Sequence, residues 1–312
     1  MTGGMAFSDY YHQWVDTYKR GAVRPVTLRK YEVAECRIRE ILGDTPLANI
    51  NRTTYQMLMN RYADTHEHQT VIDFHHLVKA SVLDAVDEGL IERDPTRRVV
   101  LKGCAPREKH QKYLSQYELH ALLGDLKLEG ATSKNWDWLI LLVAKTGLRF
   151  AEALGITPGD FDMARQALNI TKTWDYKSGT GFAKTKNNSS IRTVSVDWYT
   201  MSQFAGATKG LSGSDPIFVA RNDDGSYEMV YNSTVNKILQ RHCERVGVPT
   251  ITIHGLRHTH ASLMLYAGAS VLSVSKRLGH SSITTTQKVY LHVINEMENQ
   301  DTDLMMRTLA AI

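Results

Sequence analysis

The sequence H-G-L-R-H-T at residues 254–259 is followed by L-G-H at 278–280 and then by Tyr290. These segments carry three kinds of chemical group. Arg257 is a permanent cation whose planar fork of N–H donors suits a phosphate. The histidines that flank it can donate, accept or transfer a proton near neutral pH. Tyr290 carries a hydroxyl that can attack phosphorus and remain bonded to it. This combination is suited to phosphoryl transfer.

A further segment lies upstream, T-G-L-R-F-A-E at 146–152, which places Arg149 directly after a glycine typical of a helix end. The order and spacing of these segments resemble the tyrosine recombinase (phage integrase) family. The resemblance implies a mainly α fold with a small β-sheet (α+β). It also implies an N-terminal helical domain that binds the core site of DNA, followed by a catalytic domain.

The resemblance implies a role for each reactive group in these four segments. Tyr290 is the expected nucleophile, and the run S-S-I-T-T-T-Q-K-V at 281–289 before it resembles the family's segment at this place. Arg149 and Arg257 are the expected phosphate clamp. His254 is the expected proton acceptor near the tyrosine, and His280 the expected donor to a non-bridging phosphate oxygen. No cofactor is implied. For any one of these residues taken alone, a packing tyrosine or a salt-bridging arginine is the plainer interpretation.

Glu152 lies three residues after Arg149 and is predicted to orient that arginine rather than to act as an acid. The proton donor for the leaving oxygen is a lysine in the family. Here A-K-T-K at 183–186 resembles the family's motif, and Lys184 is favoured over Lys186. Lys172 and Lys177 are weaker alternatives. A solvated hairpin that contacts DNA without specificity is the remaining interpretation.

His254 and His258 are four residues apart, which is also the spacing of a helical zinc site. The acidic residue of a zinc protease helix is missing, and a cation lies between the two histidines instead. We therefore predict no metal. His258 and His260 are expected to be structural residues or hydrogen-bonding neighbours of the site.

The chain has 312 residues, a net charge of +4 and three cysteines. This length favours two domains. The cysteines are far apart and are expected to be reduced thiols in a cytoplasmic protein. No apolar run is long enough for a membrane span or a secretory signal.

The predicted domains are a helical DNA-binding domain at 6–102, a basic linker at 103–112 and a catalytic domain at 113–312. The first should contain four helices, near 9–19, 27–42, 52–66 and 70–89. Ser8 and Asp9 are expected to cap the first, Pro25 to open the second and Asn51 to cap the third. Cations at one helix start and along the linker are candidate DNA contacts, although a solvated helix end or linker would have the same composition. These candidates are Arg24, Thr27, Arg29, Lys30, Arg97, Arg98, Lys102, Arg107 and Lys109.

In the second domain, Ser115 and Glu118 are predicted to form a capping box before a helix. Strands are predicted at 168–172 and 191–196, with a polar hairpin region between them. The chain from residue 253 onward is predicted to be helical, with short breaks at 268–269 and 279. The C-terminal segment 295–312 is amphipathic. It is expected to dock on a neighbouring subunit, as in the family, or to fold back on its own domain.

The resemblance thus implies a site-specific recombinase for a phage or mobile element. It would act on double-stranded DNA as a homo-tetramer, be a monomer free in solution, and have an accessory directionality factor as a further partner. Strands would be exchanged through a 3′-phosphotyrosyl link and a Holliday junction. Two alternatives stay open: a type IB topoisomerase-like enzyme, and a DNA-binding protein without catalysis.

Overall fold

The computed structural model describes residues 4–105, 113–130, 132–185 and 187–290. The chain divides into two compact units, Met1–Lys109 and His110–Ile312. Each unit has a hydrophobic core of its own. The division falls inside the segment predicted to be a linker.

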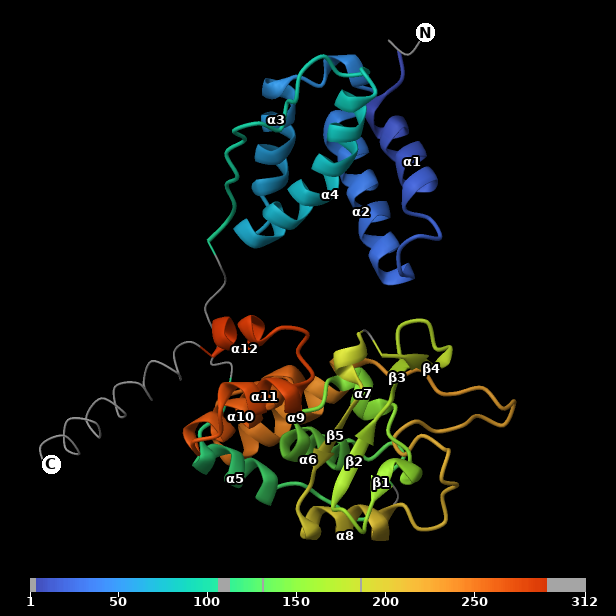
Figure 1. The fold of residues 1–312 in the computed structure, drawn as a ribbon, viewed down its shortest axis with the longest axis vertical. Coiled ribbons are helices and arrows are strands. Elements are labelled where there is room, and N and C mark those ends of the chain that lie inside the picture. The colour runs from blue at the N-terminus through green and yellow to red at the C-terminus, as the bar shows by residue number, and fades with distance from the viewer. Residues whose placement is uncertain (1–3, 106–112, 131, 186, 291–312) are drawn as a thin grey trace, which may run out of the picture. The chain divides into compact units, whose positions relative to one another are not determined.

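The first unit is built from four helices, drawn in blue to cyan in Figure 1: α1 (Phe7–Tyr18), α2 (Pro25–Leu42), α3 (Arg52–Ala63) and α4 (His68–Asp87). Local sequence explains two of the helix starts. Pro25 occupies the first turn of α2, where its missing N–H costs nothing. The Asn51 side chain accepts hydrogen bonds from the amides of Thr53 and Thr54 at the start of α3, as predicted.

The predicted ends of three of these helices are wrong. Helix α1 begins at Phe7, so Ser8 and Asp9 are not its cap. Phe7 is fully buried, and its packing in the core extends the helix without a side-chain cap. Helix α4 begins at His68 and ends at Asp87, and α3 ends at Ala63 rather than near residue 66.

The segment after α4 runs back along the first unit. The side-chain amide of Gln56 on α3 donates to the carbonyl of Val100 and accepts from its N–H, at 2.7 and 2.9 Å. The N–H of Cys104 donates to the carbonyl of His66. A Cβ at Gly103 would lie 2.4 Å from the backbone nitrogen of His68, so only glycine allows this approach. The start of the predicted linker therefore packs against α3 and α4.

The second unit contains eight α-helices in its described part: α5 (Gln116–Gly124), α6 (Trp136–Thr146), α7 (Phe150–Leu154), α8 (Trp198–Ala207), α9 (Asn232–Val246), α10 (Ile253–Tyr266), α11 (Val271–Leu278) and α12 (Ile283–Val289). The predicted capping box of Ser115 and Glu118 is present at the start of α5. Helix α6 is buried over nine of its 11 residues, and α7, α9 and α10 pack against it. It is therefore the centre of this unit.

Two small antiparallel sheets complete the second unit (Figure 1). One has the order β1 (Phe161–Asp162), β2 (Ala167–Ile170), β5 (Arg192–Ser195), and the other pairs β3 (Lys172–Asp175) with β4 (Gly181–Lys184). The prediction of one strand at 168–172 is therefore wrong. The chain leaves the first sheet after Ile170, and Lys172 already pairs with Lys184 in the second.

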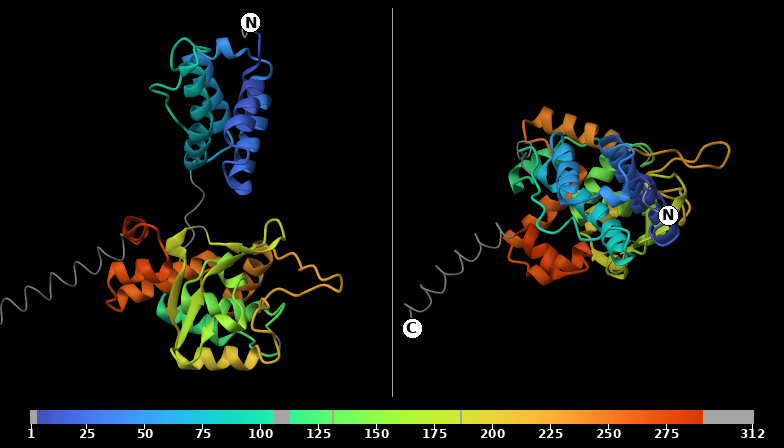
Figure 2. Two further views of the ribbon diagram at one scale, coloured as in Figure 1. Left: turned by 45° about the vertical axis from the view of Figure 1, so that its right-hand side comes forward. Right: turned by 90° about the horizontal axis from the view of Figure 1, so that it is seen from above.

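The predicted helix breaks near Gly268 and Gly279 are confirmed, because α10 ends at Tyr266 and α11 at Leu278. Figure 2 shows the loop between α8 and α9 extending away from the body of this unit. Within the described ranges, no helix has both the length and the apolar character that a membrane crossing requires. The C-terminal segment 295–312 lies outside the described residues.

Candidate phosphoryl-transfer site

The two clamp candidates are positioned by helix ends. Gly147 ends α6 in the left-handed conformation, at φ 68°. A Cβ there would lie 2.8 Å from the ring of His260, so glycine is required both by φ and by space. The chain then turns into α7, with Arg149 as its N-cap residue. Arg257 comes from the first turns of α10, whose start is capped by the side chain of Thr252.

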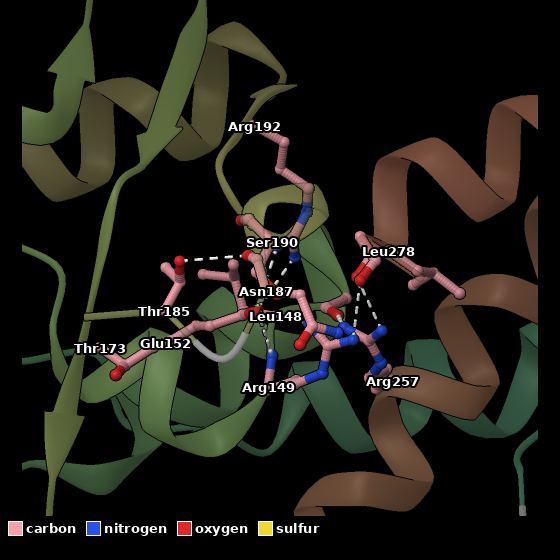
Figure 3. A network of polar contacts seen from close by, with 12 residues as sticks. Leu148, Arg149, Glu152, Thr173, Thr185, Asn187, Ser190, Arg192, Arg257 and Leu278 are labelled. Carbon is pink, nitrogen blue, oxygen red and sulfur yellow. Dashed lines mark hydrogen bonds and ion pairs between the residues drawn. The ribbon is translucent and has the colours of Figure 1, made fainter. Parts of the chain in front are cut away.

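Arg257 is 2% exposed, and its guanidinium is bound by two main-chain carbonyls. It donates to Gly147 O and to Leu278 O, both at 2.7 Å. Figure 3 shows the contact with Leu278. Burial, and then the positive charge of Arg149, lower the pKa of Arg257 to about 9. It therefore remains a cation at neutral pH.

Arg149 is also bound by a main-chain carbonyl at the C-terminal end of α11. Its guanidinium donates to Gly279 O at 2.9 Å, one residue after the carbonyl that holds Arg257. Its side chain is 36% exposed, so part of the fork is open to solvent. The end of α11 thus holds both cations near each other, although like charges repel.

Glu152 supplies a negative charge next to Arg149 (Figure 3). Its side chain is 2% exposed and accepts from the guanidinium and the backbone N–H of Arg149, at 2.6 and 3.0 Å. Arg192 donates to both of its carboxylate oxygens, at 3.2 and 2.9 Å. Burial raises the pKa of the Glu152 carboxyl, but Arg192 and Arg149 outweigh it, and the pKa lies below its usual value. Glu152 is thus an anion that orients Arg149.

Arg192 was missed by the sequence analysis. Its side chain is 7% exposed and also donates to Arg277 O at 2.6 Å and to Ser190 O at 3.0 Å. It therefore ties β5 to α11. The sequence did contain an indication of its role, because Arg192 lies two residues before the buried Val194 and so faces the same side of the strand. A cation at an inward strand position needs a buried partner.

The tyrosine hydroxyl contacts His258, whereas the expected neighbour was His254. Tyr290 is 2% exposed, and its hydroxyl shares a 3.0 Å hydrogen bond with Nδ1 of His258. The His254 ring is packed edge-on against the His258 ring, with centroids 4.6 Å apart. His258 is thus a hydrogen-bonding neighbour of the tyrosine, one of the two expectations for it, because it lies one helical turn after His254 on α10.

Electrostatics keep this group of side chains neutral in the absence of a substrate. Burial raises the pKa of Tyr290 to about 12, although Arg257 acts in the opposite direction. Burial, Arg257 and Arg149 lower the pKa of His254. Burial and the same two arginines lower the pKa of His280 to about 4.

His280 follows Gly279, which ends α11 at φ 67°. Its Nδ1 lies 2.7 Å from the hydroxyl of Thr286, a fully buried residue of α12. If the hydroxyl donates to Nδ1, the neutral ring carries its proton on Nε2 and can donate there.

His260 has a packing role. Arg277 donates through Nε to its Nε2 at 2.8 Å, so the proton lies on Nδ1, which donates to Ala144 O at 2.9 Å. Burial and Arg277 lower the pKa of His260 to about 4. The neutral ring therefore joins α6, α10 and α11.

The lysine candidates lie in different environments. Lys184 ends β4 and is exposed, whereas Lys186 lies outside the described residues. Lys172 is held by both carboxylate oxygens of Asp160, at 2.7 and 2.5 Å. Lys177 is exposed. Because Asp160 binds its ammonium group, Lys172 is less free to donate a proton to DNA than the exposed Lys177 and Lys184.

The candidate DNA contacts lie mainly on the surface of the first unit. Arg24 is the N-cap residue of α2, and its carbonyl accepts from the N–H of Thr27. Arg107 and Lys109 lie outside the described residues. The other candidates have exposed side chains: Arg29, Lys30, Arg97, Arg98 and Lys102.

Comparison with known proteins gives matches in both units. Residues 112–297 match the model of the phage integrase family, and residues 6–63 match that of the phage integrase N-terminal SAM-like domain. The chain is 25% identical to a tyrosine recombinase XerC-like protein of Caldanaerobacter subterraneus subsp. tengcongensis, over 93% of this chain and 80% of the relative. It is 24% identical to the transposase of transposon Tn916 from Enterococcus faecalis, over 88% of this chain and 72% of the relative.

Two solved structures share the fold. The Tn1549 transposon integrase in complex with a circular intermediate DNA gives a TM-score of 0.75 at 18% identity, covering 95% of this chain and 99% of that one. A λ integrase tetramer bound to a Holliday junction gives 0.65 at 17% identity, covering 90% and 79%. The family model spans more than half of the chain, and the chain therefore belongs to the phage integrase family.

Proposed function

We propose that this member of the phage integrase family is a site-specific DNA recombinase that cuts and rejoins strands for the integration or excision of a phage or mobile element. The observation that carries the proposal is the pair of arginines held by neighbouring carbonyls of α11, with a buried tyrosine close by. Two cations at this spacing can bind the non-bridging oxygens of one phosphodiester. The relatives named as a recombinase and a transposase support the same activity.

Strand cleavage follows from these groups. Tyr290 Oη attacks the phosphorus, and the bond from phosphorus to the 5′-oxygen breaks. Arg149 and Arg257 bind the non-bridging oxygens as charge develops, and His280 donates a further hydrogen bond. Lys184 or Lys186 gives its proton to the leaving 5′-oxygen. The products are a 3′-phosphotyrosyl link and a free 5′-hydroxyl.

Rejoining needs no external energy, because the phosphotyrosyl link retains the phosphodiester bond. The 5′-hydroxyl of a partner duplex attacks the link and releases the tyrosine. Two rounds of this exchange produce and resolve a Holliday junction. The family resemblance assigns the proton that Tyr290 loses to His254.

DNA binding by the first unit is supported by its basic surface. A concavity on α3 is lined by three arginines, Arg52, Arg61 and Arg98, together with polar side chains. Arg52 and Arg61 were not among the sequence candidates. Cations with neighbouring amide groups suit a phosphate backbone. We infer that this concavity and the start of α2 contact duplex DNA.

The proposed assembly is a homo-tetramer on DNA and a monomer free in solution, in the cytoplasm. The λ integrase neighbour is a tetramer on a Holliday junction. A directionality factor is a further proposed partner.

The proposal is tested with nicked suicide DNA substrates carrying a panel of attachment sequences. Wild-type protein should form an adduct that survives boiling in detergent and maps by peptide mass to Tyr290. Tyr290→Phe should bind the same DNA without forming the adduct. Tyr199→Phe, which changes an exposed tyrosine on α8, is the matched control and should react normally.

The outcomes separate the candidate functions. An adduct followed by exchange between two duplexes establishes recombination. An adduct with rejoining of the same strand only indicates a topoisomerase-like enzyme. Binding without an adduct on any sequence of the panel would refute the proposed catalysis.

A further inference from the structure

Three arginines converge on the C-terminal end of α11, and each binds a different main-chain carbonyl there. The carbonyls of residues 277, 278 and 279 accept hydrogen bonds from Arg192, Arg257 and Arg149, in that order, at 2.6, 2.7 and 2.9 Å. A helix leaves the carbonyls of its last turn without partners inside the helix, and its dipole places partial negative charge at that end. The end of α11 therefore binds both clamp arginines through charge as well as through hydrogen bonds.

The side chain of Arg277 fixes this helix end to the elements around it. Its guanidinium donates to Nε2 of His260 on α10 at 2.8 Å and to Ser195 O at the end of β5 at 3.0 Å. It also donates to Lys145 O in the last turn of α6, at 3.2 Å. Arg277 is half-buried, so water competes only in part for these bonds. One side chain thus joins α11 to a strand and to two further helices.

We propose that Arg277 is a positioning residue for DNA cleavage, whose side chain holds the end of α11 where its carbonyls set the places of Arg149 and Arg257. This inference rests on the recombinase function proposed above. Nε and both terminal nitrogens of Arg277 each donate to an acceptor within the protein. Arg277 therefore acts on the phosphate through the two clamp arginines and not by direct contact.

Loss of this anchor should misplace the clamp without releasing it. Arg257 is also bound by Gly147 O, and Arg149 is also bound by Glu152, so each keeps a partner outside α11. A displacement of about 1 Å in a group that positions a substrate can slow a reaction about 10²-fold. Cleavage should therefore respond to Arg277 far more than DNA binding does.

The experiment uses the full chain, the suicide DNA on which wild type forms its adduct, and a second DNA with a methylphosphonate at the scissile position. The methyl group replaces one non-bridging oxygen and lowers the negative charge that the arginines must bind by one. Single-turnover cleavage of both DNAs at saturating protein is measured for Arg277→Met, together with DNA affinity and melting temperature. Arg165→Met, at a position 85% exposed, is the matched control, and Arg149→Ala is the reference for a lost clamp arginine.

We expect Arg277→Met to cleave the phosphodiester about 10²-fold more slowly than wild type, with DNA affinity within about twofold. On the methylphosphonate its deficit should shrink to about tenfold or less, as for Arg149→Ala, because a misplaced clamp matters less where less charge develops. Arg277→Lys keeps the cation and some of the donors, so it should recover part of the lost rate. Arg165→Met should cleave both DNAs as wild type does.

A merely structural role predicts a different pattern, because a partly unfolded protein would cleave both DNAs more slowly by the same factor. Wild-type cleavage by Arg277→Met, or an equal deficit on the two DNAs, would each overturn the assignment. If Arg277→Met shows no melting transition, Arg277→Lys is measured on the same terms. A wild-type protein that forms no adduct counts against the proposed function, whereas a wild-type adduct with normal cleavage by Arg277→Met counts only against Arg277.

Discussion

Replacing Arg192 by methionine should destabilise the second unit strongly. The substitution keeps a long apolar side chain but removes four hydrogen bonds, two to Glu152 and one each to Arg277 O and Ser190 O. Breaking a buried ion pair by removing one partner costs about 3–5 kcal/mol. The side chains of Arg192 and Glu152 are 7% and 2% exposed, so solvent screens this pair little. Arg149 still pairs with Glu152, which favours the lower end of the range, about 3 kcal/mol.

The expected signature is a lower melting temperature with a changed acid dependence. For a domain of this size, about 3 kcal/mol corresponds to a shift of roughly 6–12 °C. The depressed pKa of Glu152 means that its contribution is present above its unfolded pKa and is lost as pH falls through the folded value. Because Arg192 is the main cause of that depression, Arg192→Met should lose less stability in acid than wild type does.

Calorimetry of the full chain between pH 3 and 8 measures both effects. Arg165→Met is the matched control, because its contact with Asp162 is 3.7 Å long and the arginine side chain is 85% exposed. Its melting temperature should stay close to that of wild type. If Arg192→Met melts within about 2 °C of wild type and has the same acid profile, the network does not stabilise α11 as argued.

Three further substitutions test other parts of the site. Thr286→Val removes the hydroxyl next to Nδ1 of His280 and should slow cleavage about tenfold without changing DNA affinity, as measured by single-turnover cleavage and a filter-binding assay. Gly279→Ala should lower the free energy of unfolding by about 1 kcal/mol, because alanine is strained at this positive φ. It should also slow cleavage, because the added methyl group would lie 2.8 Å from a guanidinium nitrogen of Arg192. A melting temperature and a cleavage rate equal to those of wild type would contradict this. Lys172→Met breaks the ion pair with Asp160 and should lower the melting temperature. A DNA substrate whose bridging 5′-oxygen is replaced by sulfur needs no proton donor, so it would rescue cleavage by a variant that lacks the acid. It should not rescue Lys172→Met.

Local sequence predicted the features that depend on near neighbours. The Asn51 cap and the Ser115 capping box are formed within three residues of each cap residue. The left-handed helix ends at Gly147 and Gly279 follow from the freedom of glycine at positive φ. Errors arose where tertiary packing overrides local preference, as at Phe7, whose burial starts α1 before its expected cap.

By itself, the sequence determined the chemical groups of this protein and their order along the chain. Through the resemblance that its motifs carry, it predicted the α+β class and a site containing Arg149, Arg257, His254, His280 and Tyr290. Only the tertiary structure decided which groups touch. It placed Tyr290 against His258, because hydrogen-bond partners far apart in sequence are fixed by how helices pack, not by any periodicity within one helix.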